Sequence, residues 1–242
     1  MKKTIIFSLI VLLALTAIVT NMTVSYYSDI ETSNDNTFTA GTVDLQIDLD
    51  CGGNCGFPLQ DLAGNPFFST CDIKPGDSSE VTLSLHINDN NSWGRIKLED
   101  IRDFEHGCTE PEAGTGDLTC GVPGEGEGEL SDYLTFTIWL DEGGLAGWQC
   151  PEGEPACSAD SAEGDNILNG LETTIVEDII ANDLANQGWI ELSEEMEGDK
   201  THYLGLEWNI PLTSSNVIQT DSLKARIKIE VSQSRNNANP WD

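Results

Sequence analysis

The side chains that could do chemistry in this sequence are three histidines, seven cysteines and many carboxylates. His86, His106 and His202 stand far apart, and none belongs to an HExxH zinc motif. No Gly-x-Ser-x-Gly elbow, phosphate-binding loop or dinucleotide fingerprint occurs. We therefore interpret the histidines as solvated or core residues, with His86 on the outward face of its strand, and predict no catalytic residue and no metal site.

Lys2 and Lys3 followed by a short apolar run resemble a secretion signal, and in an exported chain the cysteines are expected to form disulfides. Cys108 and Cys120 flank one Gly/Pro-rich loop, and Cys150 and Cys157 flank another, so each pair is expected to form a local disulfide. In a third group any two cysteines could pair and leave one thiol, and the Cys-x3-Cys spacing is also compatible with zinc, although no fourth ligand lies nearby. The members of this group are Cys51, Cys55 and Cys71.

Two further motifs could bind or be modified. The GEGEGE run at residues 124–129 lacks the spacing of an EF-hand, so it is interpreted as a flexible solvated loop. Calcium binding there would require a second acidic loop packed against it, and no cofactor is predicted. Asn90-Asn91-Ser92 fits the acceptor pattern for N-glycosylation, which makes Asn90 a candidate.

Alternating apolar residues predict the strands that position these groups. The first core strand is marked by Val43, Leu45, Ile47 and Leu49. Further alternating runs occur at residues 81–87, 96–99, 134–140, 204–210 and 223–231. Helical spacing occurs in one place, at Leu171, Ile175, Val176, Ile179, Ile180 and Leu184. We expect an all-β fold, a jelly-roll β-sandwich with one inserted helix and long disulfide-stapled loops, formed as one domain by residues 41–242.

The charge balance limits the partners that the chain can have. It carries 11 Lys and Arg against 42 Asp and Glu, a formal net charge of −31, which argues against binding nucleic acid or an anionic membrane surface. Residues 1–25 combine Lys2 and Lys3 with a short apolar run and a small-residue site before Tyr26, as in a signal peptide. We expect an extracellular protein without a membrane span after cleavage; an uncleaved anchor is the alternative.

The segment from residue 26 to residue 40 is polar except for Tyr26, Tyr27, Ile30 and Phe38. It leads into Asn36-Thr37-Phe38-Thr39-Ala40-Gly41-Thr42-Val43-Asp44-Leu45, and a Lys74-Pro75-Gly76-Asp77 turn follows. In these motifs, and in the Ile229-Glu230-Val231-Ser232-Gln233 run, the chain resembles the TasA/camelysin family, which includes biofilm matrix fibre proteins and archaeal bundling pilins. The resemblance covers residues 26–101 and 200–235 and is poor across the cysteine-bearing loops.

The resemblance implies a subunit that polymerises by donor-strand complementation. Residues 26–40 of one copy would add a strand to the sheet of the next, building a homopolymer whose filaments bundle and link cells. Three alternatives remain open. The segment could pack onto its own subunit as an ordinary strand. The chain could be a metalloprotease, as camelysin-type relatives are classed, or a monomeric surface module that binds glycan or calcium.

A cationic stripe is expected on the outward face of the last strand, formed by Lys224, Arg226 and Lys228. In so acidic a chain we expect it to pair with an acidic surface, either Asp44 and Asp48 of the first strand or an adjacent filament. The alternative is a solvated charged edge that discourages aggregation.

Overall fold

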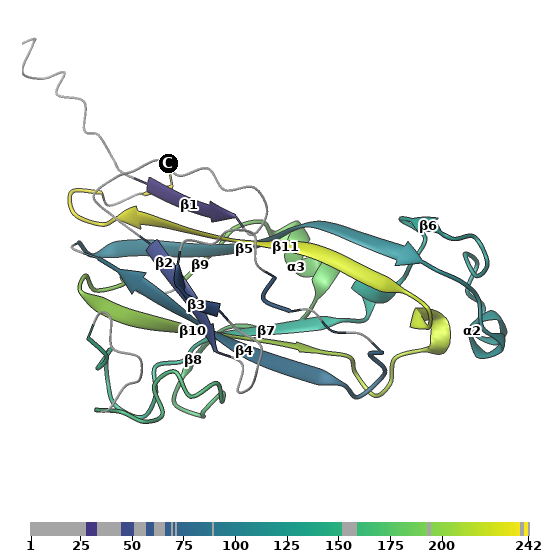
Figure 1. The fold of residues 1–242 in the computed structure, drawn as a ribbon, viewed down its shortest axis with the longest axis horizontal. Helices are drawn as coiled ribbons and strands as arrows, with labels where there is room; N and C mark the ends of the chain where they lie inside the picture. The colour runs from purple at the N-terminus through teal and green to yellow at the C-terminus, as the bar shows by residue number, and fades with distance from the viewer. Residues whose placement is uncertain are drawn as a thin grey trace, which may run out of the picture.

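The computed structural model describes residues 28–32, 45–50, 57–60, 66–68, 70, 72–88, 90–151, 159–192, 195–237 and 240–241. Their strands form two antiparallel sheets that lie one above the other (Figure 1). The first sheet has the order β1 (Ser28–Thr32), β11 (Ser222–Gln233), β5 (Ser92–Glu105) and β6 (Gly124–Glu125), with β9 (Ile190–Glu191) also paired to β5. The second has the order β3 (Phe57–Gln60), β2 (Leu45–Asp50), β4 (Ser78–Ile87), β10 (Lys200–Asn209), β7 (Thr135–Leu140) and β8 (Thr173–Ile180). The all-β expectation is confirmed.

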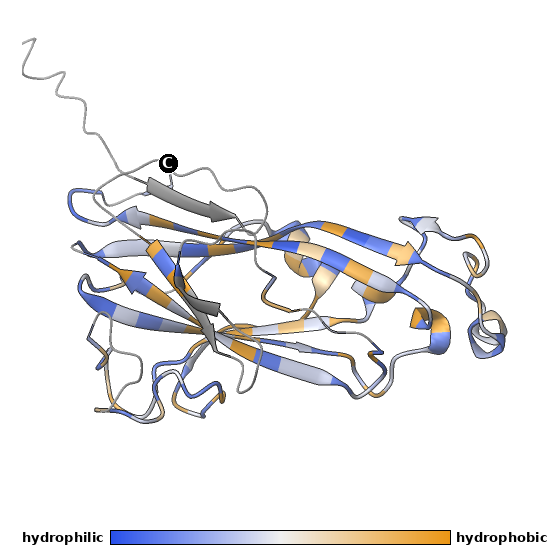
Figure 2. Ribbon diagram, viewed as in Figure 1, coloured by the Kyte–Doolittle hydropathy of each residue, from blue (hydrophilic) through white to orange (hydrophobic). Residues whose placement is uncertain are grey.

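One hydrophobic core fills the space between the two sheets. Ile229 and Val231 of β11, and Leu204 and Leu206 of β10, belong to this core and are almost completely buried. Figure 2 shows the alternation of apolar and polar residues along the strands that the sequence predicted. Most of the predicted strand centres are confirmed. Strand β2 is described from Leu45 onward, and Val43 lies outside the described residues.

The second sheet is covered on its other face as well, so His86, which the sequence placed on the outward face of its strand as a solvated or core residue, is buried. Thr82, Ser84 and His86 alternate with the core residues of β4, yet all three are buried. The segment between β7 and β8 lies against this face, where Asp141 and Asn166 accept hydrogen bonds from the hydroxyl of Thr82, each at 3.0 Å. His86 is therefore buried beneath a loop and not solvated.

The predicted helix over residues 171–184 is wrong for most of its length. Residues Thr173–Ile180 form strand β8, which pairs with β7, and only Ala181–Gln187 form the helix α3. The reason is the run of β-branched side chains in β8, which favours a strand at a free sheet edge over a helix. Leu184 of α3 is buried in the core.

The segment between β5 and β7 is more ordered than its lack of periodicity predicts. It contains the helix α2 (Glu110–Thr115), strand β6 and the short 3-10 helix η1 (Leu130–Asp132). A disulfide joins Cys108 to Cys120, as predicted. A second 3-10 helix, η2 (Asn216–Ile218), precedes β11. No helix among the described residues is long and apolar enough to cross a bilayer.

Candidate functional site

Strand β1 lies at the outer edge of the first sheet, where it pairs with β11 (Figure 1). The pairing is antiparallel and runs from Ser28 opposite Ser232 to Thr32 opposite Lys228. Ile30, one of the predicted apolar residues of this segment, stands opposite Glu230. Strand β1, the first described strand, is therefore paired with β11, the last described strand.

Strand β1 covers only part of the β11 edge. β11 extends from Ser222 to Gln233, whereas its pairing with β1 spans Lys228 to Ser232. No other described strand pairs with this edge over residues 222–227. Unpaired backbone groups at a sheet edge form a template for pairing with another chain. We call the edge of β11 that faces β1 the β11 edge.

The predicted cationic stripe lies on β11 beside that edge, and its described ion pairs are with β5. Lys228 Nζ lies 2.5 Å from Glu99 Oε1, and Arg226 contacts both Glu99 and Asp100. Lys224 lies over the ring of Phe104, with Nζ 5.3 Å from the centroid. Asp44 and the side chain of Asp48, the partners expected from the sequence, lie outside the described residues.

The side chains of Lys97, Glu99, Asp100, Arg226 and Lys228 form what we call the charged face of the first sheet, and Glu99 lies at its centre. Burial alone would raise the pKa of its carboxyl, but hydrogen bonds and charges from Lys228 and Lys97 lower this pKa to about 2. Lys97 Nζ lies 2.9 Å from Glu99 Oε2. Glu99 therefore stays ionised in the folded protein and joins β5 to β11 through their side chains as well as through their backbones.

Sequence reasoning missed a second part of the charged face, around Arg95. The guanidinium forms an ion pair of 2.5 Å with the buried carboxylate of Glu230. It also lies between two indoles, 4.4 Å from the ring centroid of Trp189 and 4.1 Å from that of Trp241. Arg95 and Glu230 are distant in the sequence, and the pairing of β5 with β11 places them opposite each other. The signal in the sequence was the alternation of Arg95 and Lys97 with apolar residues.

Several predicted residues lie outside the part of the chain that the structure describes. Of the proposed donor segment, the structure describes only residues 28–32, and of those only the backbone. The residues affected are Tyr26, Tyr27, Phe38, Val43, Cys51, Cys55, Cys71 and Cys157. Cys150 is disulfide-bonded, and its predicted partner, Cys157, lies outside the described residues.

The remaining candidates that the structure describes are His202, His106 and Asn90. His202 is buried, and Trp148 packs edge-on against it with a centroid distance of 4.7 Å. Burial lowers the pKa of His202 to about 4, so its imidazole is neutral. His106 is exposed and contacts Ser222. Asn90 lies in a bend before β5, and its carbonyl oxygen accepts a hydrogen bond from the buried hydroxyl of Ser92.

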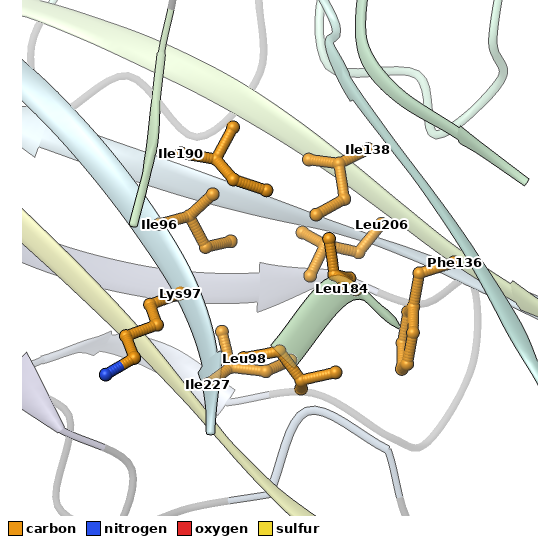
Figure 3. Close-up of a pocket in the computed structure, with 9 residues that line it drawn as sticks. All are labelled: Ile96, Lys97, Leu98, Phe136, Ile138, Leu184, Ile190, Leu206 and Ile227. Carbon is orange, nitrogen blue, oxygen red and sulfur yellow. The ribbon is translucent and has the colours of Figure 1, made fainter. Parts of the chain in front are cut away.

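An apolar pocket lies between the two sheets beside α3. Figure 3 shows aliphatic and aromatic side chains from five strands and α3 facing one another there, among them Phe136, Leu184 and Ile227. The amine of Lys97 points away from them. With no polar group directed into it, the pocket is a gap in core packing and offers no group for chemistry.

No model of a known protein family matches this chain, and no characterised protein is detectably similar to it.

Proposed function

We propose that this chain is the structural subunit of an extracellular filament, a pilus or matrix fibre, and that copies join when β1 of one pairs with the β11 edge of the next. The observation that supports this most is the position of β1: a five-residue strand at a sheet edge, paired with one strand only. Residues 33–44 separate it from β2, which belongs to the other sheet. The resemblance to the TasA/camelysin family adds to this, and the proposed architecture is a jelly roll exported through residues 1–25.

Exchange of β1 between copies costs few contacts. The backbone hydrogen bonds that β1 makes to its own β11 would be replaced by the same bonds to a neighbour's β11, each worth about 0.5–1.5 kcal/mol net. Such an exchange is a low-cost route to assembly. Because the contact is head-to-tail, it generates an open filament unless the rotation between copies closes a ring. The part of the β11 edge with which no described strand pairs, residues 222–227, gives an incoming segment a place to begin pairing.

The metalloprotease alternative finds less support. Among the described residues, the groups of three side chains close enough to share a metal ion contain no histidine. His86 and His202 are both buried in the second sheet. A zinc protease needs ligands beside an open coordination position that water can reach.

The decisive experiment compares two forms of the protein. One begins at Tyr26, after the proposed signal, and the other begins at Gly41, which removes β1. We expect filaments by negative-stain electron microscopy only from the longer form, while both forms unfold cooperatively in urea. A peptide of residues 26–40 added to the shorter form should raise its stability without producing filaments.

A third form separates β1 pairing from mere length. In the full mature chain, Ile30→Pro removes a backbone donor from the middle of β1, and we expect it to reduce filament formation strongly. Filaments formed equally well by the chain that begins at Gly41 would refute the proposal.

A further inference from the structure

Five carboxylates converge at the end of the molecule that carries α2 and β6 (Figure 1). Glu105 is the last residue of β5, Glu112 lies in α2, and Asp117 follows that helix. Glu129 immediately precedes η1, and Asp221 immediately precedes β11. These segments are distant in the sequence and meet only in the folded chain. We call the five residues the carboxylate cluster.

The oxygens of the cluster lie close enough together to share a cation. One oxygen each from Glu105, Asp117 and Glu129 lies within 4.8 Å of the other two, and Glu105, Glu112 and Asp221 form a second such group. Ca²⁺ binds oxygens at about 2.3–2.6 Å, so oxygens around one ion lie within roughly 5 Å of one another. Glu105 belongs to both groups and is the centre of the cluster.

Burial makes the cluster unlike a solvated acidic patch. Glu105 is only 1% exposed and Glu112 is 0% exposed. Oε1 of Glu105 accepts hydrogen bonds from the Gly107 amide at 2.7 Å and from the Thr220 hydroxyl at 2.8 Å, but its buried Oε2 has no hydrogen-bond partner.

The same is true of one oxygen in each of three other cluster residues. Oδ2 of Asp117, Oε2 of Glu129 and Oδ1 of Asp221 are buried without a hydrogen-bond partner. A buried carboxylate oxygen without a donor is strongly unfavourable unless a positive charge satisfies it. Four such oxygens in one place require a common explanation.

The carboxylates of the other long loop, between β7 and β8, provide a contrast. Both oxygens of Asp141 accept hydrogen bonds, from the amides of Gly164 and Asn166. The oxygens of Asp160 and Glu163 also accept backbone amides. Carboxylates satisfied in this way organise a loop without needing a cation. In the cluster only Glu112 has both oxygens satisfied, by the Thr109 amide and the Thr220 hydroxyl, whereas each of the other four members keeps one buried oxygen without a donor.

No basic side chain neutralises the cluster: none of the ion pairs among the described residues includes any of its five members. Burial raises the pKa of Glu112 and of Glu129, with the charges of neighbouring carboxylates adding to the shift. The cluster thus concentrates negative charge that the protein itself does not balance.

We infer that the carboxylate cluster binds Ca²⁺, with Glu105 contributing to both halves of the site. The ligands are hard oxygens from several carboxylates, a set that suits Ca²⁺, whereas Mg²⁺ retains several waters and prefers fewer protein ligands. The sulfurs of Cys108 and Cys120 lie near Glu112 but form a disulfide, so they provide no thiolate for a softer metal.

The disulfide and the cation act on the same loop. Cys108 and Cys120 close the segment that carries Glu112 and Asp117, and the ion ties this segment to the end of β5 and the start of β11. Glu129 belongs to the GEGEGE run, whose carboxylates lack EF-hand spacing; here the other ligands come from distant segments. The site does not depend on filament formation.

The test is calcium titration of the mature protein, residues 26–242, with its disulfides intact. After removal of metal with EDTA, CaCl2 and MgCl2 are titrated separately by calorimetry in roughly 0.5 M NaCl, which screens non-specific attraction to so acidic a chain. Glu105→Gln and Asp221→Asn each remove a charge from the cluster. Glu110→Gln is the matched control, because Glu110 is an exposed residue of the same helix as Glu112.

We expect the wild type and Glu110→Gln to bind Ca²⁺ to saturation at the same fixed stoichiometry, and their melting temperatures to rise with Ca²⁺. Both cluster variants should bind about tenfold or more weakly. Without metal, Glu105→Gln should melt no lower than the wild type, because it removes an unsatisfied buried charge; a purely structural role would lower its melting temperature in both conditions.

Three outcomes would overturn the assignment. They are unsaturable binding by the wild type, unchanged Ca²⁺ affinity in the cluster variants, and an equal response to Mg²⁺. Should Glu105→Gln fail to fold, the wild-type titration and Asp221→Asn still decide between these results.

Discussion

Gly205 lies on β10 directly against the indole of Trp139, its neighbour across the β10–β7 pair. A Cβ added to Gly205 would lie 2.0 Å from Cε2 of the indole, far inside van der Waals contact. Trp139 is only 1% exposed and so has little room to move. The absence of a side chain at this position lets the indole lie directly against the backbone of β10.

Gly205→Ala should therefore destabilise the fold by about 1–3 kcal/mol, the usual range for overpacking a buried site. Urea unfolding followed by tryptophan fluorescence measures this change. Gly170→Ala is the control, because a Cβ there meets no atom within 4 Å, and it should shift stability by less than about 0.5 kcal/mol. Equal changes in unfolding free energy for the two substitutions would show that the Trp139 side chain can move away from a Cβ at residue 205 at little cost.

Asp221 gives the carboxylate cluster a dependence on pH. Burial raises the pKa of Asp221 to about 7, opposed by a hydrogen bond from the Glu129 amide and assisted by the charges of Glu129, Glu105 and Glu112. In the unfolded chain the pKa returns to about 3.8. Between these values the folded, metal-free protein binds a proton that the unfolded chain does not, so this group makes stability fall as pH rises from about 4 to about 7.

In EDTA, Asp221→Asn should remove this contribution, so that the variant gains stability over the wild type as pH rises through that window. The comparison uses urea unfolding at several pH values, and taking the difference between the two proteins cancels the titration of the groups that do not interact with Asp221. Glu110→Gln should follow the wild type throughout. A constant difference between wild type and Asp221→Asn across the window would contradict the raised pKa.

Strands β5 and β11 are joined by side chains as well as by backbone. Lys228 and Glu99 are each largely buried, with side-chain exposures of 24% and 17%. Reversing one of these charges leaves two carboxylates in contact in a place that water reaches poorly. The charged face therefore stabilises the pairing of β5 with β11, and with it the position of the β11 edge.

Lys228→Glu should destabilise the protein by about 1–3 kcal/mol, the scale of a charged hydrogen bond that is lost. Lys224→Glu makes the same change in net charge on the same strand, but Lys224 is exposed and its described contact is the ring of Phe104. We expect Lys224→Glu to cost about 1 kcal/mol or less. Chemical unfolding of both variants gives the comparison, and equal losses would mean that only net charge matters.

The sequence predicted some of the strands and helices and not others. Alternation identified β4, β7, β10 and β11, because each has one face in the core. The sequence pattern failed for β8, because its apolar residues fit the spacing of a helix while its β-branched side chains also favour a strand. Pairing with β7 selects the strand. The carboxylate cluster could not be predicted, because Glu105 and Asp221 meet only through the β5–β11 register.

For the whole molecule, the net charge of −31 opposes every contact between copies. The described ion pairs of the cationic stripe are formed within the chain, with Glu99 and Asp100. Two of the three basic residues are thus already neutralised before a second copy approaches. Repulsion between copies must be screened by ions in solution.

Filament formation should accordingly be faster at high salt than at low salt. Light scattering by the mature protein, followed from about 10 mM to roughly 500 mM NaCl, should show a rising rate, since the Debye length falls from about 30 Å toward 4 Å over this range. Sucrose at matched viscosity is the control. Assembly that slows with salt would instead indicate attraction between oppositely charged surfaces of neighbouring copies.

The chain passes from one sheet to the other repeatedly, and β1 and β11 are neighbours in space although nearly the whole sequence lies between them. Pairings of such long sequence separation form late, because the intervening chain must be ordered first. During the slowest phase of folding, β1 would therefore still be unpaired with β11. In the proposed filament, β1 of such a molecule would meet the β11 edge of a folded neighbour before it pairs with β11 of its own chain, so late pairing within one chain would promote exchange between copies.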